Sequence, residues 1–116
     1  MKRYQFRLER LQKLRQRKLE QKQIALAEVL LYQRQVEHQI AQLGVLRAEH
    51  QSEMRQTLQQ TDLMVDRVIQ SRAYDAVLQR LGSQLNQQLV QIERVVDARR
   101  AEVVAAERDK KVLENL

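Results

Sequence analysis

Apolar residues recur at alternating spacings of three and four along two long stretches, and this heptad pattern restricts the fold more than any other feature. Nine of fourteen positions are apolar in the first series, and nine of thirteen in the second. Series of this length predict amphipathic helices that pack along one seam. The first series is Tyr4, Leu8, Leu11, Arg15, Lys18, Lys22, Ala25, Val29, Tyr32, Val36, Gln39, Leu43, Leu46 and His50. The second is Tyr74, Leu78, Leu81, Leu85, Gln88, Ile92, Val95, Arg99, Glu102, Ala106, Asp109, Leu113 and Leu116.

Between the two series the heptad phase is lost, which predicts a turn. Thr61, Asp62, Asp66 and Ser71 offer capping side chains or first-turn carboxylates for a second helix there. We therefore predict an all-α fold, a long two-helix antiparallel coiled-coil hairpin with its turn near residues 58–70. The helices are expected over about 3–57 and 66–116, within a single coiled-coil domain over 1–116. One uninterrupted helix is the alternative.

The composition agrees with long helices. The chain is 43% hydrophobic but only 3% aromatic, with no Pro and two Gly among 116 residues, so a globular core of large side chains is not expected. The absence of Cys removes disulfides, thiolate zinc sites and Cys nucleophiles, and fits a reducing compartment. No signal peptide and no apolar run of membrane-spanning length occurs. We expect a soluble, cytoplasmic protein.

An antiparallel hairpin predicts a register, because the numbers of facing residues then have a nearly constant sum. Setting Leu43 opposite Leu85 and Leu46 opposite Leu81 gives sums of 127 to 128. The same register predicts Val36 opposite Ile92, Tyr32 opposite Val95, Gln39 opposite Gln88, Lys18 opposite Asp109, Gly44 almost opposite Gly82, and Leu11 opposite Leu116. Residues 1–10 then lack a partner helix. The glycine pair suggests close approach, a bend or a notch, or simply two tolerated glycines.

No catalytic or phosphate-binding motif occurs in the sequence. His38 and His50 occupy different heptad positions, so they do not predict a metal site. We expect a protein that is not an enzyme and that has no cofactor.

The positive charge is concentrated at the N-terminus. Residues 1–22 hold nine Lys or Arg against two Glu, whereas residues 23–116 hold twelve against thirteen acidic residues. A basic helix before heptads is typical of bZIP proteins, but this segment lacks the Asn and small residues that read bases. We expect no specific nucleic-acid binding, only salt-sensitive attraction to RNA or anionic lipid. A mitochondrial transit peptide is disfavoured because no Ser or Thr precedes Ser52.

The N-terminal residues YQFRLERLQKLR resemble the opening of the FliJ family, the coiled-coil component of the flagellar type III export apparatus. The resemblance rests on Tyr4, Phe6, Arg7, Leu8, Glu9, Leu11, Leu14 and Arg15. The C-terminal RRAEVVAAERDKKVLENL resembles the family's second helix at Arg99, Ala105, Lys111, Leu113, Glu114 and Leu116. Gln12 replaces a frequent Leu, and the family's charged C-terminal tail does not follow Leu116, as expected of a truncated chain.

The resemblance implies a non-enzymatic stalk and chaperone component in flagellum biogenesis and motility, similar to the gamma subunit of rotary ATP synthases. It implies that the stalk enters or promotes assembly of the hexameric export ATPase (FliI-like) and contacts the cytoplasmic domain of the export gate (FlhA-like) and export chaperones. It also implies a cytoplasmic protein peripherally associated with the inner membrane at the export apparatus. Alone, the chain is expected to be a monomer.

The resemblance and the register together suggest two sets of binding residues. For the ATPase ring these are Tyr4, Phe6, Arg7, Leu8, Leu11, Arg15, Lys18 and Lys22. For the export gate they are Gln39, Leu43, Leu46, His50, Tyr74, Leu78 and Leu81. Several gate residues are seam positions, so burial is an equal explanation for them. The alternatives are the equivalent stalk of a virulence type III secretion system, and a basic coiled coil that binds nucleic acid or anionic membrane.

Overall fold

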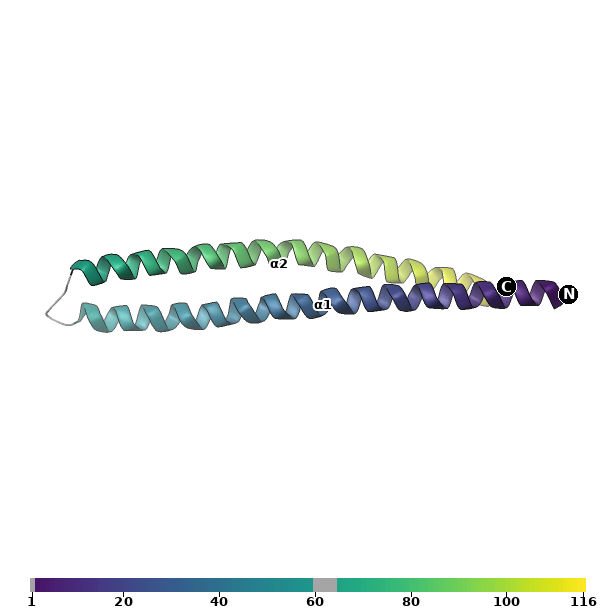
Figure 1. The fold of residues 1–116 in the computed structure, drawn as a ribbon, viewed down its shortest axis with the longest axis horizontal. Helices are drawn as coiled ribbons and strands as arrows, with labels where there is room; N and C mark the ends of the chain where they lie inside the picture. The colour runs from purple at the N-terminus through teal and green to yellow at the C-terminus, as the bar shows by residue number, and fades with distance from the viewer. Residues whose placement is uncertain (1, 60–64) are drawn as a thin grey trace. The chain divides into compact units, whose positions relative to one another are not determined.

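The protein is an all-α antiparallel helical hairpin, as predicted (Figure 1). The computed structural model describes residues 2–59 and 65–116. Helix α1 covers Lys2–Leu58 and helix α2 covers Val65–Glu114. Within these ranges there is no strand. The predicted helix limits, 3–57 and 66–116, agree with the observed limits to within two residues.

The helix ends lie where the heptad phase was lost. Gln59 N donates hydrogen bonds to the carbonyls of Arg55 and Gln56 as α1 ends. Asp66 lies in the first turn of α2, where a carboxylate interacts favourably with the helix dipole. Ser71 lies within α2 rather than at its start, and Thr61 and Asp62 lie outside the described residues.

The hairpin divides into two compact units, in each of which α1 and α2 lie side by side. The first unit comprises Met1–Gln33 with Ile92–Leu116, and the second comprises Arg34–Gln91. Because α1 and α2 each contribute to both units, neither unit is built from one helix alone. The single coiled-coil domain over 1–116 stays a prediction.

Burial follows two rows of residues on each helix, which we call the first and second inner rows. The first inner rows hold half of the predicted series and are confirmed, although several polar members are only half-buried. They comprise Leu8, Arg15, Lys22, Val29, Val36, Leu43 and His50 of α1, and Leu78, Leu85, Ile92, Arg99, Ala106 and Leu113 of α2. The second inner rows were not predicted. They comprise Gln12, Leu19, Leu26, Gln33, Ile40, Arg47 and Met54 of α1, and Val68, Asp75, Gly82, Leu89, Val96, Val103 and Lys110 of α2.

The other half of the predicted seam lies at the edge of the helix contact, and that part of the prediction was wrong. We call these positions the side rows; all are exposed except Ala25, which is half-buried. They comprise Tyr4, Leu11, Lys18, Ala25, Tyr32, Gln39 and Leu46 of α1, and Tyr74, Leu81, Gln88, Val95, Glu102, Asp109 and Leu116 of α2. Each helix thus has three adjacent apolar rows, and a two-helix contact buries only two of them.

The observed register differs from the predicted one by about one helical turn. In the first unit the Arg15 guanidinium donates to the Asp109 carbonyl, and Lys22 Nζ lies 3.2 Å from Glu102 Oε2. The numbers in both pairs add to 124, against 127 to 128 predicted. Lys18, the expected partner of Asp109, is exposed. At about 1.5 Å rise per residue, the difference is a slide of about 5 Å.

The two glycines do not face each other, contrary to the prediction. Gly44 is exposed, and a Cβ built on it would meet no atom within 4 Å. Gly82 is half-buried in the second inner row of α2, and its Cβ would lie 3.4 Å from Leu43 Cδ2. The close approach of the helices therefore involves Gly82 and Leu43, in the second unit.

Candidate docking surfaces

The N-terminal end of α1 extends past the end of α2 in the first unit (Figure 1). Glu9 and Glu114 line the same groove, so the last turn of α2 ends near residue 9 of α1. We call Lys2–Leu8, which lies beyond that point, the tip. The prediction was that residues 1–10 lack a helical partner. In the structure the segment beyond the end of α2 stops at residue 8.

The tip exposes both of its aromatic side chains. Tyr4 is 65% exposed and Phe6 62% exposed, whereas Leu8 is half-buried. The Arg10 guanidinium carbon lies 6.0 Å from the centroid of the Phe6 ring, at the outer limit of a cation–π contact. Exposed aromatic residues among cations are frequent anchors in protein interfaces.

A shallow hollow continues the tip along α1. Arg7, Arg10, Leu11 and Leu14 line it, and Leu11 and Leu14 are both exposed. Two of the predicted ring-binding residues, Arg7 and Leu11, thus lie together. A surface of this kind combines apolar contact with attraction to acidic groups.

Cations farther along α1 differ in what they contact. Arg15 and Lys22 reach α2, through the Asp109 carbonyl and the Glu102 carboxylate. Lys18, on the side row, is exposed. Two of these three predicted ring-binding residues therefore link α1 to α2, and only Lys18 is exposed for a partner.

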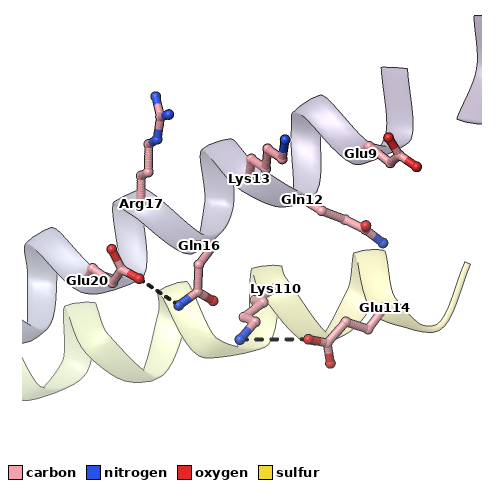
Figure 2. Close-up of a pocket in the computed structure, with 8 residues that line it drawn as sticks. All are labelled: Glu9, Gln12, Lys13, Gln16, Arg17, Glu20, Lys110 and Glu114. Atoms are coloured by element: carbon pink, nitrogen blue, oxygen red, sulfur yellow. Dashed lines mark hydrogen bonds and ion pairs between the residues drawn. The ribbon is translucent and has the colours of Figure 1, made fainter. Parts of the chain in front are cut away.

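A polar groove of the first unit lies between the N-terminal part of α1 and the last turns of α2 (Figure 2). Gln16 Nε2 donates a 3.0 Å hydrogen bond to Glu20 Oε1, and Lys110 Nζ lies 3.8 Å from Glu114 Oε1. Three carboxylates and three cations line this groove, so its charges balance. Its lining residues are Glu9, Gln12, Lys13, Gln16, Arg17, Glu20, Lys110 and Glu114.

Four of the seven predicted gate residues line one hollow in the second unit. They are Gln39, Leu43, Leu46 and Leu81, and the hollow is completed by Gln42, Gln84, Leu85 and Gln88. Gln39 and Gln88, which the predicted register sets opposite each other on the seam, are both exposed here, so they form no buried layer. Each helix contributes two leucines and two glutamines, giving an apolar floor with hydrogen-bonding groups around it.

The remaining gate residues lie closer to the turn, and one of them is inaccessible. His50 and Tyr74 pack edge to face with ring centroids 4.8 Å apart, and His50 Nε2 lies 3.1 Å from the Ser71 carbonyl. Tyr74 is 42% exposed and Leu81 44% exposed. Leu78, another predicted gate residue, is only 2% exposed and packs between the helices, so it is not accessible to a partner.

The sequence reasoning missed two further polar links between the helices. In the first unit the Arg99 guanidinium donates to the Ala25 carbonyl. In the second unit Arg47 Nη2 lies 4.0 Å from Asp75 Oδ1. Arg47 and Asp75 both belong to the second inner rows, so a correct seam assignment would have revealed this pair.

Two other kinds of site are absent from the described part of the chain. No three His, Asp or Glu side chains there gather in a way that could hold a metal ion. Neither described helix contains a stretch apolar and long enough to cross a membrane.

No family model, curated protein or solved structure matches this chain. The features that bear on its function are the N-terminal resemblance, the tip and the hollow of the second unit.

Proposed function

We propose that this chain is the non-enzymatic stalk of a flagellar type III protein export apparatus. One observation carries the proposal: the start of the segment that resembles the FliJ family lies in the tip, which projects past the end of α2 in the first unit and exposes Tyr4 and Phe6. A projecting helical end with exposed aromatic residues suits insertion into a ring. The proposed partner is a hexameric export ATPase, with Arg7, Arg10 and Leu11 contacting acidic and apolar groups of its subunits.

The second proposed contact is with the cytoplasmic domain of an export gate. It is supported by the hollow of the second unit, where Leu46 and Leu81 are exposed beside four glutamines. Gln39, Leu43, Leu46, Leu81 and Tyr74 are the residues assigned to it. Leu78 acts through packing only, since it is buried. Export chaperones are proposed as further partners, and the protein acts in the cytoplasm at the inner membrane.

Ring assembly tests the proposed ATPase contact. Purified export ATPase is mixed with the full chain and nucleotide, and the hexamer fraction is measured by negative-stain microscopy or light scattering. We expect the wild-type chain to raise the hexamer fraction and the Phe6→Ala, Leu8→Ala double variant to raise it much less. Val90→Ala, Val104→Ala is the matched control, because both valines are exposed on α2, away from the tip. An equal response to the tip variant would refute the proposed contact.

A second candidate function, binding of a basic coiled coil to anionic membrane or nucleic acid, is favoured by the exposed cations Arg3, Arg10, Lys13 and Arg17. It predicts binding to anionic vesicles or RNA that disappears as salt is raised and that survives Phe6→Ala, Leu8→Ala. ATPase binding that depends on Phe6 and Leu8 at moderate salt supports the stalk instead.

A further inference from the structure

A further hollow of the second unit contains two arginines, one from each helix, and we call it the arginine hollow. Arg55 of α1 and Arg72 of α2 both line it, and both side chains are exposed. Its volume is about 390 Å³. The other lining residues are His50, Gln51, Met54, Ser71 and Asp75. All seven residues belong to the second unit, so the hollow is formed within one compact part of the chain.

The floor of the arginine hollow is held in place by contacts between the two helices. His50 Nε2 lies 3.1 Å from the Ser71 carbonyl, and the His50 ring packs edge to face on Tyr74. His50, Met54 and Ser71 are half-buried, in contrast to the exposed arginines. The hollow therefore has a half-buried floor and a cationic side chain from each helix at its rim.

The positive charge of the arginine hollow is not neutralised by its own acidic residue. Asp75 Oδ1 lies 4.0 Å from Arg47 Nη2, and Asp75 Oδ2 accepts a 3.5 Å hydrogen bond from Gln79 Nε2. The Asp75 carboxylate is thus engaged by two residues that do not line the hollow. Within residues 2–59 and 65–116, neither Arg55 nor Arg72 makes an ion pair or a side-chain hydrogen bond.

We propose that the arginine hollow binds a phosphate group, either as the free ion or as part of a small organic phosphate. A guanidinium can donate two parallel hydrogen bonds to phosphate oxygens, and Arg55 and Arg72 can do so from two sides. The Ser71 hydroxyl and the Gln51 amide offer further donors. A phosphate group has three acceptor oxygens where a carboxylate has two, so it satisfies donors from both helices more fully. Met54 offers an apolar contact to an organic group.

This inference goes beyond the proposed function. The arginine hollow shares no residue with the tip, Lys2–Leu8, or with the hollow lined by Gln39, Gln42, Gln84 and Gln88. Substitutions in the arginine hollow should therefore leave ATPase binding unchanged, and substitutions in the tip should leave phosphate binding unchanged. Failure of one proposal is consequently distinguishable from failure of the other.

A nuclear magnetic resonance titration of the full, ¹⁵N-labelled chain tests the site. Inorganic phosphate, phenyl phosphate and acetate are each added at constant ionic strength, so that general screening of charge does not change. We expect inorganic phosphate to cause saturable shifts of the backbone amide signals of residues 50–55 and 71–75. The absence of a saturable shift at these amides overturns the proposal.

Arginine substitutions then separate the hollow from the general positive charge of the chain. Arg55→Gln, Arg72→Gln should weaken phosphate binding by at least about tenfold, because charge-assisted hydrogen bonds are lost. The matched control is Arg34→Gln, Arg80→Gln, which removes the same charge from one exposed position on each helix of the same unit. The control should bind phosphate like the wild type, and far-UV circular dichroism checks that both variants are folded. Equal affinities of the two variants would overturn the proposal.

The other two ligands test the chemical class and distinguish the sources of the phosphate group. Tighter binding of phenyl phosphate than of inorganic phosphate supports a small organic phosphate whose organic group contacts Met54. Equal binding of these two supports the free ion. Acetate should bind more weakly than either, because a carboxylate satisfies fewer donors. Acetate binding as tight as that of inorganic phosphate would overturn the assignment to phosphate.

Discussion

Gly44 is a helix-interior glycine whose missing side chain leaves space around it. A glycine in such a position costs about 1 kcal/mol relative to Ala. A Cβ on Gly44 meets nothing within 4 Å, so Gly44→Ala should raise the free energy of unfolding by about 1 kcal/mol. Urea denaturation followed by circular dichroism measures this change. Gly82→Ala is the comparison: its new methyl group would contact Leu43, and we expect no larger gain. A loss of stability in Gly44→Ala would contradict the open position assigned to this residue.

Leu78 and Leu81 lie one helical turn apart on α2 but differ in burial, so substituting each of them should affect stability differently. Leu78 is buried, whereas Leu81 lies on the exposed side row. Leu78→Ala should lower the free energy of unfolding by roughly 2 to 5 kcal/mol. Leu81→Ala should lower it by less than about 1 kcal/mol, because a partly exposed side chain leaves a smaller cavity. Equal losses in the two variants, measured in urea, would place Leu81 inside the seam after all.

At the scale of the helices, introduced cysteines can distinguish the two registers directly. Leu43→Cys, Gly82→Cys should form an intramolecular disulfide readily, because both positions are on inner rows and lie close together. Leu46→Cys, Leu81→Cys, the pair that faces in the sequence-based register, should react more slowly, since both side chains point to the hollow at the edge. The rates follow from non-reducing electrophoresis. Faster disulfide formation in the Leu46→Cys, Leu81→Cys variant would support the register predicted from the sequence instead.

The helices and their turn were predictable because long heptad series and the loss of phase between them are strong signals. Only the first inner rows of the seam could be predicted, because residues of the same type differ in burial within one helix. Leu11 and Leu19 are both leucines in α1, yet only Leu19 is buried; Val95 and Val96 are adjacent valines in α2, yet only Val96 is buried. The spacing of the apolar residues allows either row to face the partner helix. The rotation of each helix about its own axis determines which row is buried.

At the scale of the whole molecule, the prediction of a single domain implies one unfolding event. Both units consist of segments from α1 and α2, so melting either helix removes contacts from both. Thermal unfolding followed at 222 nm should show one transition. Leu113→Ala in the first unit and Leu78→Ala in the second should each lower the midpoint of that same transition. Two separate transitions, each sensitive to one substitution, would show that the units unfold independently.

The candidate sites were predictable to different degrees. Tyr4 and Phe6 could be singled out because they stand beside concentrated charge at the end of a heptad series. Leu78 could not be separated from Leu81 by sequence, since both fit the series and only the rotation of α2 buries one of them. The links made by Arg15 and Lys22 depend on the register, which a slide of one helical turn changes completely.

Direct binding of the full chain to a hexameric export ATPase is the measurement that tests the stalk proposal most directly. Biolayer interferometry with the immobilised ATPase should detect binding of the wild-type chain. Phe6→Ala, Leu8→Ala should weaken it by at least about tenfold, as expected for the loss of interface anchors. Val90→Ala, Val104→Ala should bind like the wild type. Absence of wild-type binding, or equal binding by the tip variant, would contradict the proposal.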